Sequence, residues 1–132
     1  MVDVVLDTSV WIAALRDDTP GVKDAVDDLL AKGRVGLCGP VLLELRQGLR
    51  PRERPILSLL DDLPYLEAER VDWERAGDLV RELRAKGLTL PGSDMLIAAL
   101  CVRHDCWLLT LDKHFDHVPK LKRMKLPARK TH

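Results

Sequence analysis

Short apolar segments alternate along this sequence with longer segments in which apolar residues recur at helical spacing. The short segments are rich in β-branched or aliphatic side chains and end at polar or turn-forming residues, which predicts buried strands at residues 2–6, 35–38 and 107–110. The longer segments predict helices at residues 10–16, 21–32, 41–49, 51–63, 72–86 and 95–103. Because strands that alternate with helices form parallel sheets, we expect an α/β fold with helices on both faces of a parallel sheet.

Weaker segments complete the predicted order of elements. Residues 65–66 form either a brief strand or an extended connection, residues 113–117 a helical turn, and residues 124–126 a possible last strand. Gly33 and Gly87 each follow a helix that they are expected to end. The chain has no internal repeat and no linker-like segment, so we expect residues 1–132 to form a single domain.

Composition excludes several classes of protein. The chain is 46% hydrophobic and 32% charged, which argues against a disordered or low-complexity chain. Its uncharged apolar runs are far shorter than the ~20 residues that a membrane-spanning helix needs, and Asp3 interrupts the region where a leader peptide would have its apolar stretch. Three cysteines without a CxxC pair favour a reducing compartment. We therefore expect a cytoplasmic protein with no membrane segment.

The zero net charge conceals an uneven distribution of charge. Residues 1–116 carry a net charge of −6, and the segment after Asp116 contains six basic residues and no acidic one: Lys120, Lys122, Arg123, Lys125, Arg129 and Lys130. A basic segment on an acidic body is compatible with binding to a polyanion such as RNA or DNA, and equally with a solvated C-terminal tail.

Four carboxylates stand where predicted strands end or predicted helices begin. Asp7 follows the first strand, Glu44 lies one turn into the helix after the second strand, Asp94 opens the helix at 95–103, and Asp112 follows the last clear strand. Taken singly, each aspartate suits a helix N-cap, and Glu44 suits a solvent-facing position. Because ligands bind beyond the carboxyl ends of the strands in open parallel sheets, we expect the four side chains to point toward one edge.

A cluster of carboxylates favours a divalent cation. Carboxylates in one cleft repel one another, and some hold protons at neutral pH unless a cation is present. Mg²⁺ or Mn²⁺ prefers oxygen ligands, accepts phosphate oxygens and lowers the pKa of a bound water, so the expected reaction is phosphoryl-group chemistry. The sequence contains neither GxxxxGK nor GxGxxG, so nothing supports the use of a nucleoside triphosphate.

Four segments of the chain resemble, in order and spacing, the motifs of PIN-domain nucleases. They are VVLDTSV at residues 4–10, ELRQG at 44–48, PGSDMLIAA at 91–99 and LTLDKHF at 109–115. The resemblance covers almost the entire chain. The small size of the chain resembles in particular the VapC toxins of type II toxin–antitoxin pairs.

The resemblance implies a PIN-like sheet of about five parallel strands and a Mg²⁺- or Mn²⁺-dependent endoribonuclease. It implies that Asp7 and Asp94 are the principal metal ligands, and that Glu44 and Asp112 complete a catalytic set of four. We expect metal-activated water to attack an RNA phosphodiester in line, leaving 5′-phosphate and 3′-hydroxyl ends. Either Asp94 or Asp112 would orient or deprotonate that water, with no need for a histidine.

The resemblance also implies partners. These are an RNA substrate, a cognate antitoxin protein that covers a groove near the apolar residues 56–63, and a second copy of the chain in a homodimer. Candidates for phosphate contacts are Arg46, Arg50, Arg52, Arg54, Lys113 and the basic tail. Two other functions stay open: a PIN nuclease that processes RNA or cuts DNA without an antitoxin, and a non-catalytic PIN module that binds RNA or protein.

Several further residues have simpler expected roles. A hydroxyl at Ser9 or Thr8 would hydrogen-bond within the site, as the resemblance implies, and Asp116 would either join the carboxylates or pair with the basic tail. His114 and His117 are spaced i, i+3 but lack the further ligands of a recognisable zinc site. The three tryptophans have apolar neighbours, which predicts packing in the core or at an interface for Trp11, Trp73 and Trp107.

Overall fold

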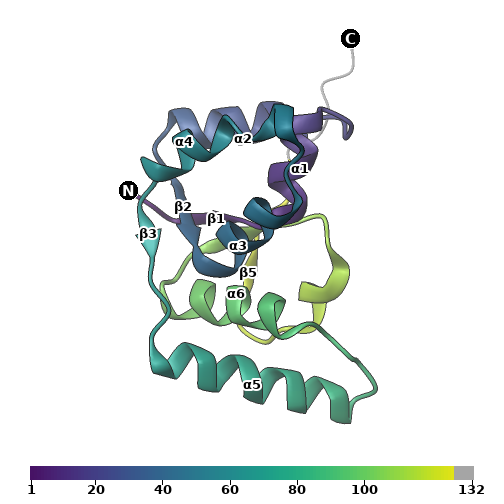
Figure 1. Cartoon of the computed structure of the whole chain (residues 1–132). Helices are drawn as coiled ribbons and strands as arrows, with labels where there is room; N and C mark the ends of the chain where they lie inside the picture. The colour runs from purple at the N-terminus through teal and green to yellow at the C-terminus, as the bar shows by residue number, and fades with distance from the viewer. Residues whose placement is uncertain (127–132) are drawn as a thin grey trace.

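The computed structural model describes residues 1–126 and contains one sheet of five strands. All neighbouring strands are parallel, and their order across the sheet is β3-β2-β1-β4-β5 (Figure 1). The strands are β1 (Val4–Leu6), β2 (Val35–Cys38), β3 (Tyr65–Leu66), β4 (Trp107–Leu109) and β5 (Lys122–Arg123). The predicted α/β fold with a parallel sheet of about five strands is confirmed.

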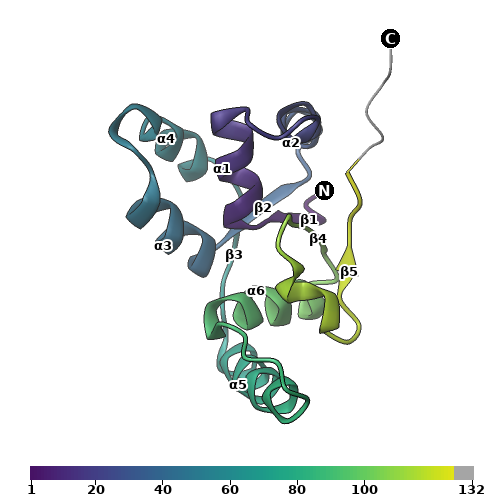
Figure 2. The same cartoon turned by 90° about the vertical axis from the view of Figure 1, so that its right-hand side faces the viewer.

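Helices cover both faces of this sheet. The helices are α1 (Thr8–Arg16), α2 (Val22–Ala31), α3 (Gly39–Gly48), α4 (Ile56–Asp61), α5 (Arg70–Ala85) and α6 (Gly92–Arg103), with 3₁₀ turns η1 (Pro51–Glu53) and η2 (Lys113–His117). In Figures 1 and 2, α1, α2 and α4 lie above the strands, whereas α6 and α5 lie below them. No helix in the described part of the chain is long and apolar enough to cross a membrane.

The core is built around β1 and α6. β1 is the central strand, and its three residues are at most 1% exposed because helices cover both of its sides. In α6 every residue from Met95 to Cys101 is buried. This helix lies between the sheet and α5, so it has no solvent-facing side over that length (Figure 2). The sequence prediction of a deeply buried helix here is confirmed.

Two predicted segments have different boundaries in the structure. The single helix expected at residues 51–63 is divided into η1 and α4, because Pro55 has no amide hydrogen with which to continue a helix. The last strand is β5 at Lys122–Arg123 rather than at residues 124–126. Met124 nevertheless donates its amide hydrogen to the carbonyl of Leu108 at 2.8 Å, so the chain still follows β4 beyond the end of β5.

The tryptophans do not share one environment. Trp11 is 2% exposed and packs in the core, but Trp73 is 62% exposed and does not, so of its two predicted places only an interface stays a prediction. The buried face of α5 instead contains Asp72, together with Ala76, Leu79 and Leu83. Trp107 lies near the sheet edge at 37% exposure, with the ammonium group of Lys122 5.0 Å from its ring centroid.

Candidate functional site

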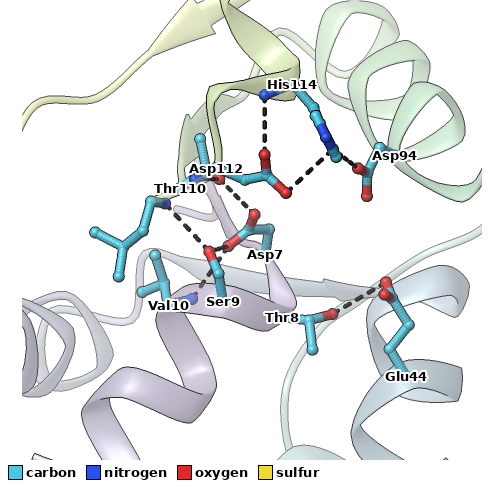
Figure 3. A network of polar contacts seen from close by, with 10 residues as sticks. Asp7, Thr8, Ser9, Val10, Glu44, Asp94, Thr110, Asp112 and His114 are labelled. Carbon is cyan, nitrogen blue, oxygen red and sulfur yellow. Dashed lines mark hydrogen bonds and ion pairs between the residues drawn. The ribbon is translucent and has the colours of Figure 1, made fainter. Parts of the chain in front are cut away.

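Asp7 lies at the carboxyl end of the central strand. Its backbone is extended and its side chain caps α1, because Oδ1 accepts a hydrogen bond from the amide of Val10 at 3.1 Å. The same oxygen accepts a hydrogen bond from the hydroxyl of Ser9 at 2.6 Å, and the other carboxylate oxygen accepts one from the hydroxyl of Thr110 (Figure 3). Asp7 is only 4% exposed, so these donors hold a buried carboxylate in one orientation.

The loop after β4 brings Asp112 beside Asp7. Thr110 donates its hydroxyl hydrogen to Asp7 and accepts a hydrogen bond from the amide of Asp112 at 2.9 Å. The amide of Leu111 donates to the hydroxyl of Ser9 at 3.1 Å, which is a second link between this loop and the start of α1. Asp112 also caps η2 through a hydrogen bond from the amide of His114.

Asp94 and His114 complete the tightest group of possible ligands. Nδ1 of His114 lies 2.9 Å from Oδ2 of Asp94 and 3.2 Å from Oδ2 of Asp112. One ligand atom from each of these three residues lies within 4.8 Å of the other two. Asp94 is the third residue of α6 and not its N-cap, because the helix begins at Gly92. Its carboxylate is stabilised by its place in the first turn of a helix.

Glu44 approaches the site from α3. Its Oε1 accepts a hydrogen bond from the hydroxyl of Thr8 at 3.1 Å, so the first residue of α1 holds Glu44 while the second, Ser9, holds Asp7 (Figure 3). Both hydroxyl contacts agree with the expectation for Thr8 and Ser9. In the described residues, Glu44 and Asp7 lie outside the tight group formed by Asp94, Asp112 and His114.

The four carboxylates influence one another's charge. Burial raises the pKa of Asp7, the hydrogen bonds from Ser9, Thr110 and Val10 oppose that effect, and the charge of Asp112 adds to it. Burial also raises the pKa of Glu44, and the negative charges of Asp94, Asp7 and Asp112 raise it further. The hydrogen bond to Asp94 raises the pKa of His114. The site therefore attracts protons and other cations.

The structure brings all four predicted carboxylates to the carboxyl edge of the sheet. Asp7 and Asp112 are helix caps, as the simple interpretation expects, and both also face the cluster, while their catalytic role stays a prediction. Asp116 does not join the cluster, because it pairs with Arg123.

Sequence reasoning missed two polar residues that organise the site. Both belong to the segment 109–115 that resembles a PIN motif, but the sequence assigns neither of them a role at the site. His114 lies two residues after Asp112 in the same turn, and the hydroxyl of Thr110 connects Asp7 to the loop of Asp112.

The donor set suits a hard divalent cation. Asp94 and Asp112 each offer an oxygen atom beside Nδ1 of His114, and Asp7 and Glu44 supply further negative charge. Carboxylates whose pKa values are raised by crowding and burial are stabilised in their charged form by a nearby cation. The residues present therefore fit Mg²⁺ or Mn²⁺.

The structure is an open parallel α/β sheet with crowded carboxylates at its carboxyl edge, the edge at which ligands bind in folds of this class. The PIN domain family model matches residues 4–121, and the chain belongs to that family.

Two relatives are similar over most of their length. The VapC ribonuclease Mb1587 of Mycobacterium bovis and the ribonuclease VapC11 of Mycobacterium tuberculosis (strain H37Rv) are each 28% identical over 128 residues, covering 92% of this chain and 96% of theirs. Among solved structures, VapBC2 from Rickettsia felis bound to a promoter DNA fragment matches with a TM-score of 0.76 at 23% identity, covering 94% of this chain and 98% of that one. DNA-bound VapBC from Salmonella typhimurium matches with the same TM-score and coverage at 19% identity, and these two likenesses show the fold.

Proposed function

We propose that this protein is a metal-dependent endoribonuclease and the toxin component of a type II toxin–antitoxin pair. The observation that carries the proposal is the convergence of four carboxylates from separate segments of the chain at the carboxyl edge of the sheet. The relatives named as VapC ribonucleases support RNA as the substrate. The three unpaired thiols support a reducing, cytoplasmic setting.

Asp94, Asp112 and Asp7 are the proposed holders of Mg²⁺ or Mn²⁺, with Glu44 completing the acidic set. The cation supplies a lowered pKa for a bound water and charge compensation for the phosphate under attack. Asp94 or Asp112 orients the attacking water and accepts its proton, because these carboxylates are more exposed than Asp7. Ser9 and Thr110 act as positioning residues that fix the carboxylate of Asp7.

The proposal includes an antitoxin and a second copy of the chain as partners. Solved structures of similar fold are VapBC proteins and a toxin–antitoxin complex from Klebsiella pneumoniae, which supports a protein partner for this chain. Leu43 on α3 and Leu59 on α4 are 59% and 40% exposed and supply apolar surface for an antitoxin. Light scattering of the purified chain, alone and with the product of an adjacent reading frame, tests both partners.

Cleavage of RNA by the purified protein tests the enzymatic proposal. We expect cleavage in Mg²⁺ or Mn²⁺, none in EDTA, and products with 5′-phosphate and 3′-hydroxyl ends. Binding of RNA without cleavage in either metal would favour the non-catalytic alternative, and cleavage of DNA but not RNA would favour the DNA nuclease. Sequencing the cut ends of total RNA after induced expression identifies the cleaved site.

The variant Asp7→Asn tests the role of the central carboxylate. We expect undetectable cleavage with an unchanged circular dichroism spectrum, because asparagine can still cap α1 but cannot supply the negative charge. The matched control is Asp27→Asn, which removes an exposed carboxylate of α2 and should leave cleavage unchanged. Full activity of Asp7→Asn would refute the assigned role.

A further inference from the structure

A hollow with basic residues in its lining opens beside the acidic cluster. Its volume is about 300 Å³, and it shares Thr110 and Asp112 with the cluster. The other charged residues that line it are Lys113, Asp116, Arg123 and Lys125. The hollow is therefore continuous with the proposed metal site, but its lining contains three basic residues, Lys113, Arg123 and Lys125, against two acidic ones.

The topology of the sheet explains why basic residues reach this position. β5 is parallel to β4, with Leu108 opposite Arg123, so both strands end at the same edge. The hydrogen bond from the amide of Met124 to the carbonyl of Leu108 keeps the following chain beside β4. Continuing that register places Lys125 at the level of Thr110, the residue that binds Asp7. The basic segment after Asp116 thus folds back to the site as far as the structure describes it, although Arg129 and Lys130 lie outside the described residues.

The charges of the hollow favour an anion. Arg123 pairs with Asp116, and each side chain of this pair is 46% exposed. Lys113 and Lys125 are exposed and form no ion pair with any residue among 1–126. Two lysines therefore line the hollow without an ion-pair partner among the described residues, while the guanidinium of Arg123 is already paired with Asp116.

We propose that this hollow binds a backbone phosphate of the RNA strand, next to the phosphodiester that the acidic cluster cleaves. Lys113 and Lys125 are the principal cations of this subsite, and Asp116 limits the contribution of Arg123. The inference rests on the proposed nuclease function. The proposed subsite explains why acidic and basic residues lie side by side. The scissile phosphate would contact the carboxylates through a cation, whereas the neighbouring phosphate would contact the lysines directly.

Binding of a fluorescent single-stranded RNA oligonucleotide in EDTA tests this subsite without cleavage. In the double variant Lys113→Ala with Lys125→Ala, we expect Kd to rise roughly tenfold at low salt, and the slope of log K against log salt to become less negative by about 1.4, since each single-strand phosphate contact contributes about 0.7. In Asp116→Asn we expect tighter binding and a more negative slope, because Arg123 is released to the hollow. Loss of folding does not produce these opposite changes.

The matched control removes one lysine in α2 and one directly after this helix. Lys23→Ala with Lys32→Ala makes the same change in net charge, but Lys32 follows α2 where the chain enters β2, at the opposite edge of the sheet. An equal loss of RNA affinity in this control, or an unchanged salt slope in the first variant, would overturn the subsite.

Cleavage kinetics separate the subsite from the proposed function. With Mg²⁺ present we expect the lysine double variant to raise KM while kcat stays within a factor of about three, because the lysines act in binding rather than at the reacting bond. If the unaltered protein cuts no RNA, the nuclease proposal fails and the binding experiment still decides the subsite. If it cuts RNA but the double variant and the control behave alike, only the subsite fails.

Discussion

At the scale of single residues, Thr110 connects the two halves of the candidate site. Its hydroxyl donates to Asp7 and accepts from the amide of Asp112, so one oxygen fixes the relative position of two carboxylates. Asp7 is buried, and an oxygen atom that loses its donor there is costly to keep charged. Thr110 therefore acts on the reaction by positioning Asp7.

We expect the variant Thr110→Val to lower kcat about 10- to 100-fold, the usual effect of removing a residue that orients a metal ligand. It should also lower the free energy of unfolding by about 1–3 kcal/mol, because a buried acceptor and an amide lose their partner. The control is Thr110→Ser, which keeps the hydroxyl and should retain most activity. Cleavage rates and urea unfolding measure both effects, and equal activity of the valine and serine variants would contradict the positioning role.

The site residues differ in how far the sequence revealed them. Asp7 and Asp112 could be predicted because each follows an apolar strand, and parallel strands end at a common edge. His114 could not be predicted as a site residue in this way, because its contact with Asp94 depends on how η2 packs against the start of α6. That packing is a long-range contact for which the local sequence has no periodic signal.

At the scale of elements, an ion pair determines which face of α5 is buried. The side chain of Asp72 is 2% exposed and receives hydrogen bonds from Arg103 at 2.7 and 2.8 Å and from the amide of Glu69 at 2.9 Å. Helical spacing alone would place Trp73 on the same face as Ala76, but Asp72 lies on the buried face instead, where Arg103 of α6 neutralises it. A pattern of apolar residues cannot show that a charged residue has a buried partner.

The strands and most helices could be predicted because the periodicity of apolar residues and the positions of glycines agreed. Gly33, for example, has a φ of +66° just beyond the end of α2.

The contact between Asp72 and Arg103 makes stability depend on pH. Burial alone would raise the pKa of Asp72, but the hydrogen bonds from Arg103 and Glu69 outweigh burial and leave the pKa below its ordinary value. A carboxyl group with a lowered pKa stabilises the fold above its unfolded pKa of about 3.9, and that contribution is lost as pH falls through the folded value.

We expect Asp72→Asn to reduce the free energy of unfolding at pH 7 by about 2–4 kcal/mol, because Arg103 loses its charged partner. The difference from the unaltered protein should shrink as pH falls from about 4 through the lower pKa of the folded state, below which Asp72 is protonated in both states. Urea unfolding across this pH range measures the effect. Asp78→Asn changes an exposed carboxylate of the same helix and serves as the control. A difference that stays constant with pH would contradict the ion pair's role.

At the scale of the whole molecule, the fold places four carboxylates close together at the carboxyl edge of the sheet without enough positive charge beside them to balance theirs. Burial and mutual repulsion raise the pKa values of Asp7 and Glu44, which makes the charged cluster unfavourable without a cation. A ligand that binds only the folded state stabilises it in proportion to the logarithm of its concentration. Divalent metal should therefore stabilise the entire domain, even though it contacts only one edge of the sheet.

We expect Mg²⁺ at about 100 times its Kd to add about 2.7 kcal/mol to the free energy of unfolding. For a chain of this size the midpoint of thermal unfolding should rise by at least about 5 °C. EDTA should reverse the rise, Asp94→Asn should abolish most of it, and Asp27→Asn should leave it intact. Differential scanning calorimetry measures the shift, and an equal rise in Asp94→Asn would place the bound metal elsewhere.

All three thiols of the molecule lie in its interior. Cys38, Cys101 and Cys106 are at most 2% exposed, and burial raises the pKa of Cys38 to about 12. An alkylating reagent such as iodoacetamide needs an accessible thiolate, so it reacts only when the chain opens. The rate at which these three cysteines are alkylated therefore reports how often the chain opens, and mass spectrometry can measure that rate without an engineered residue.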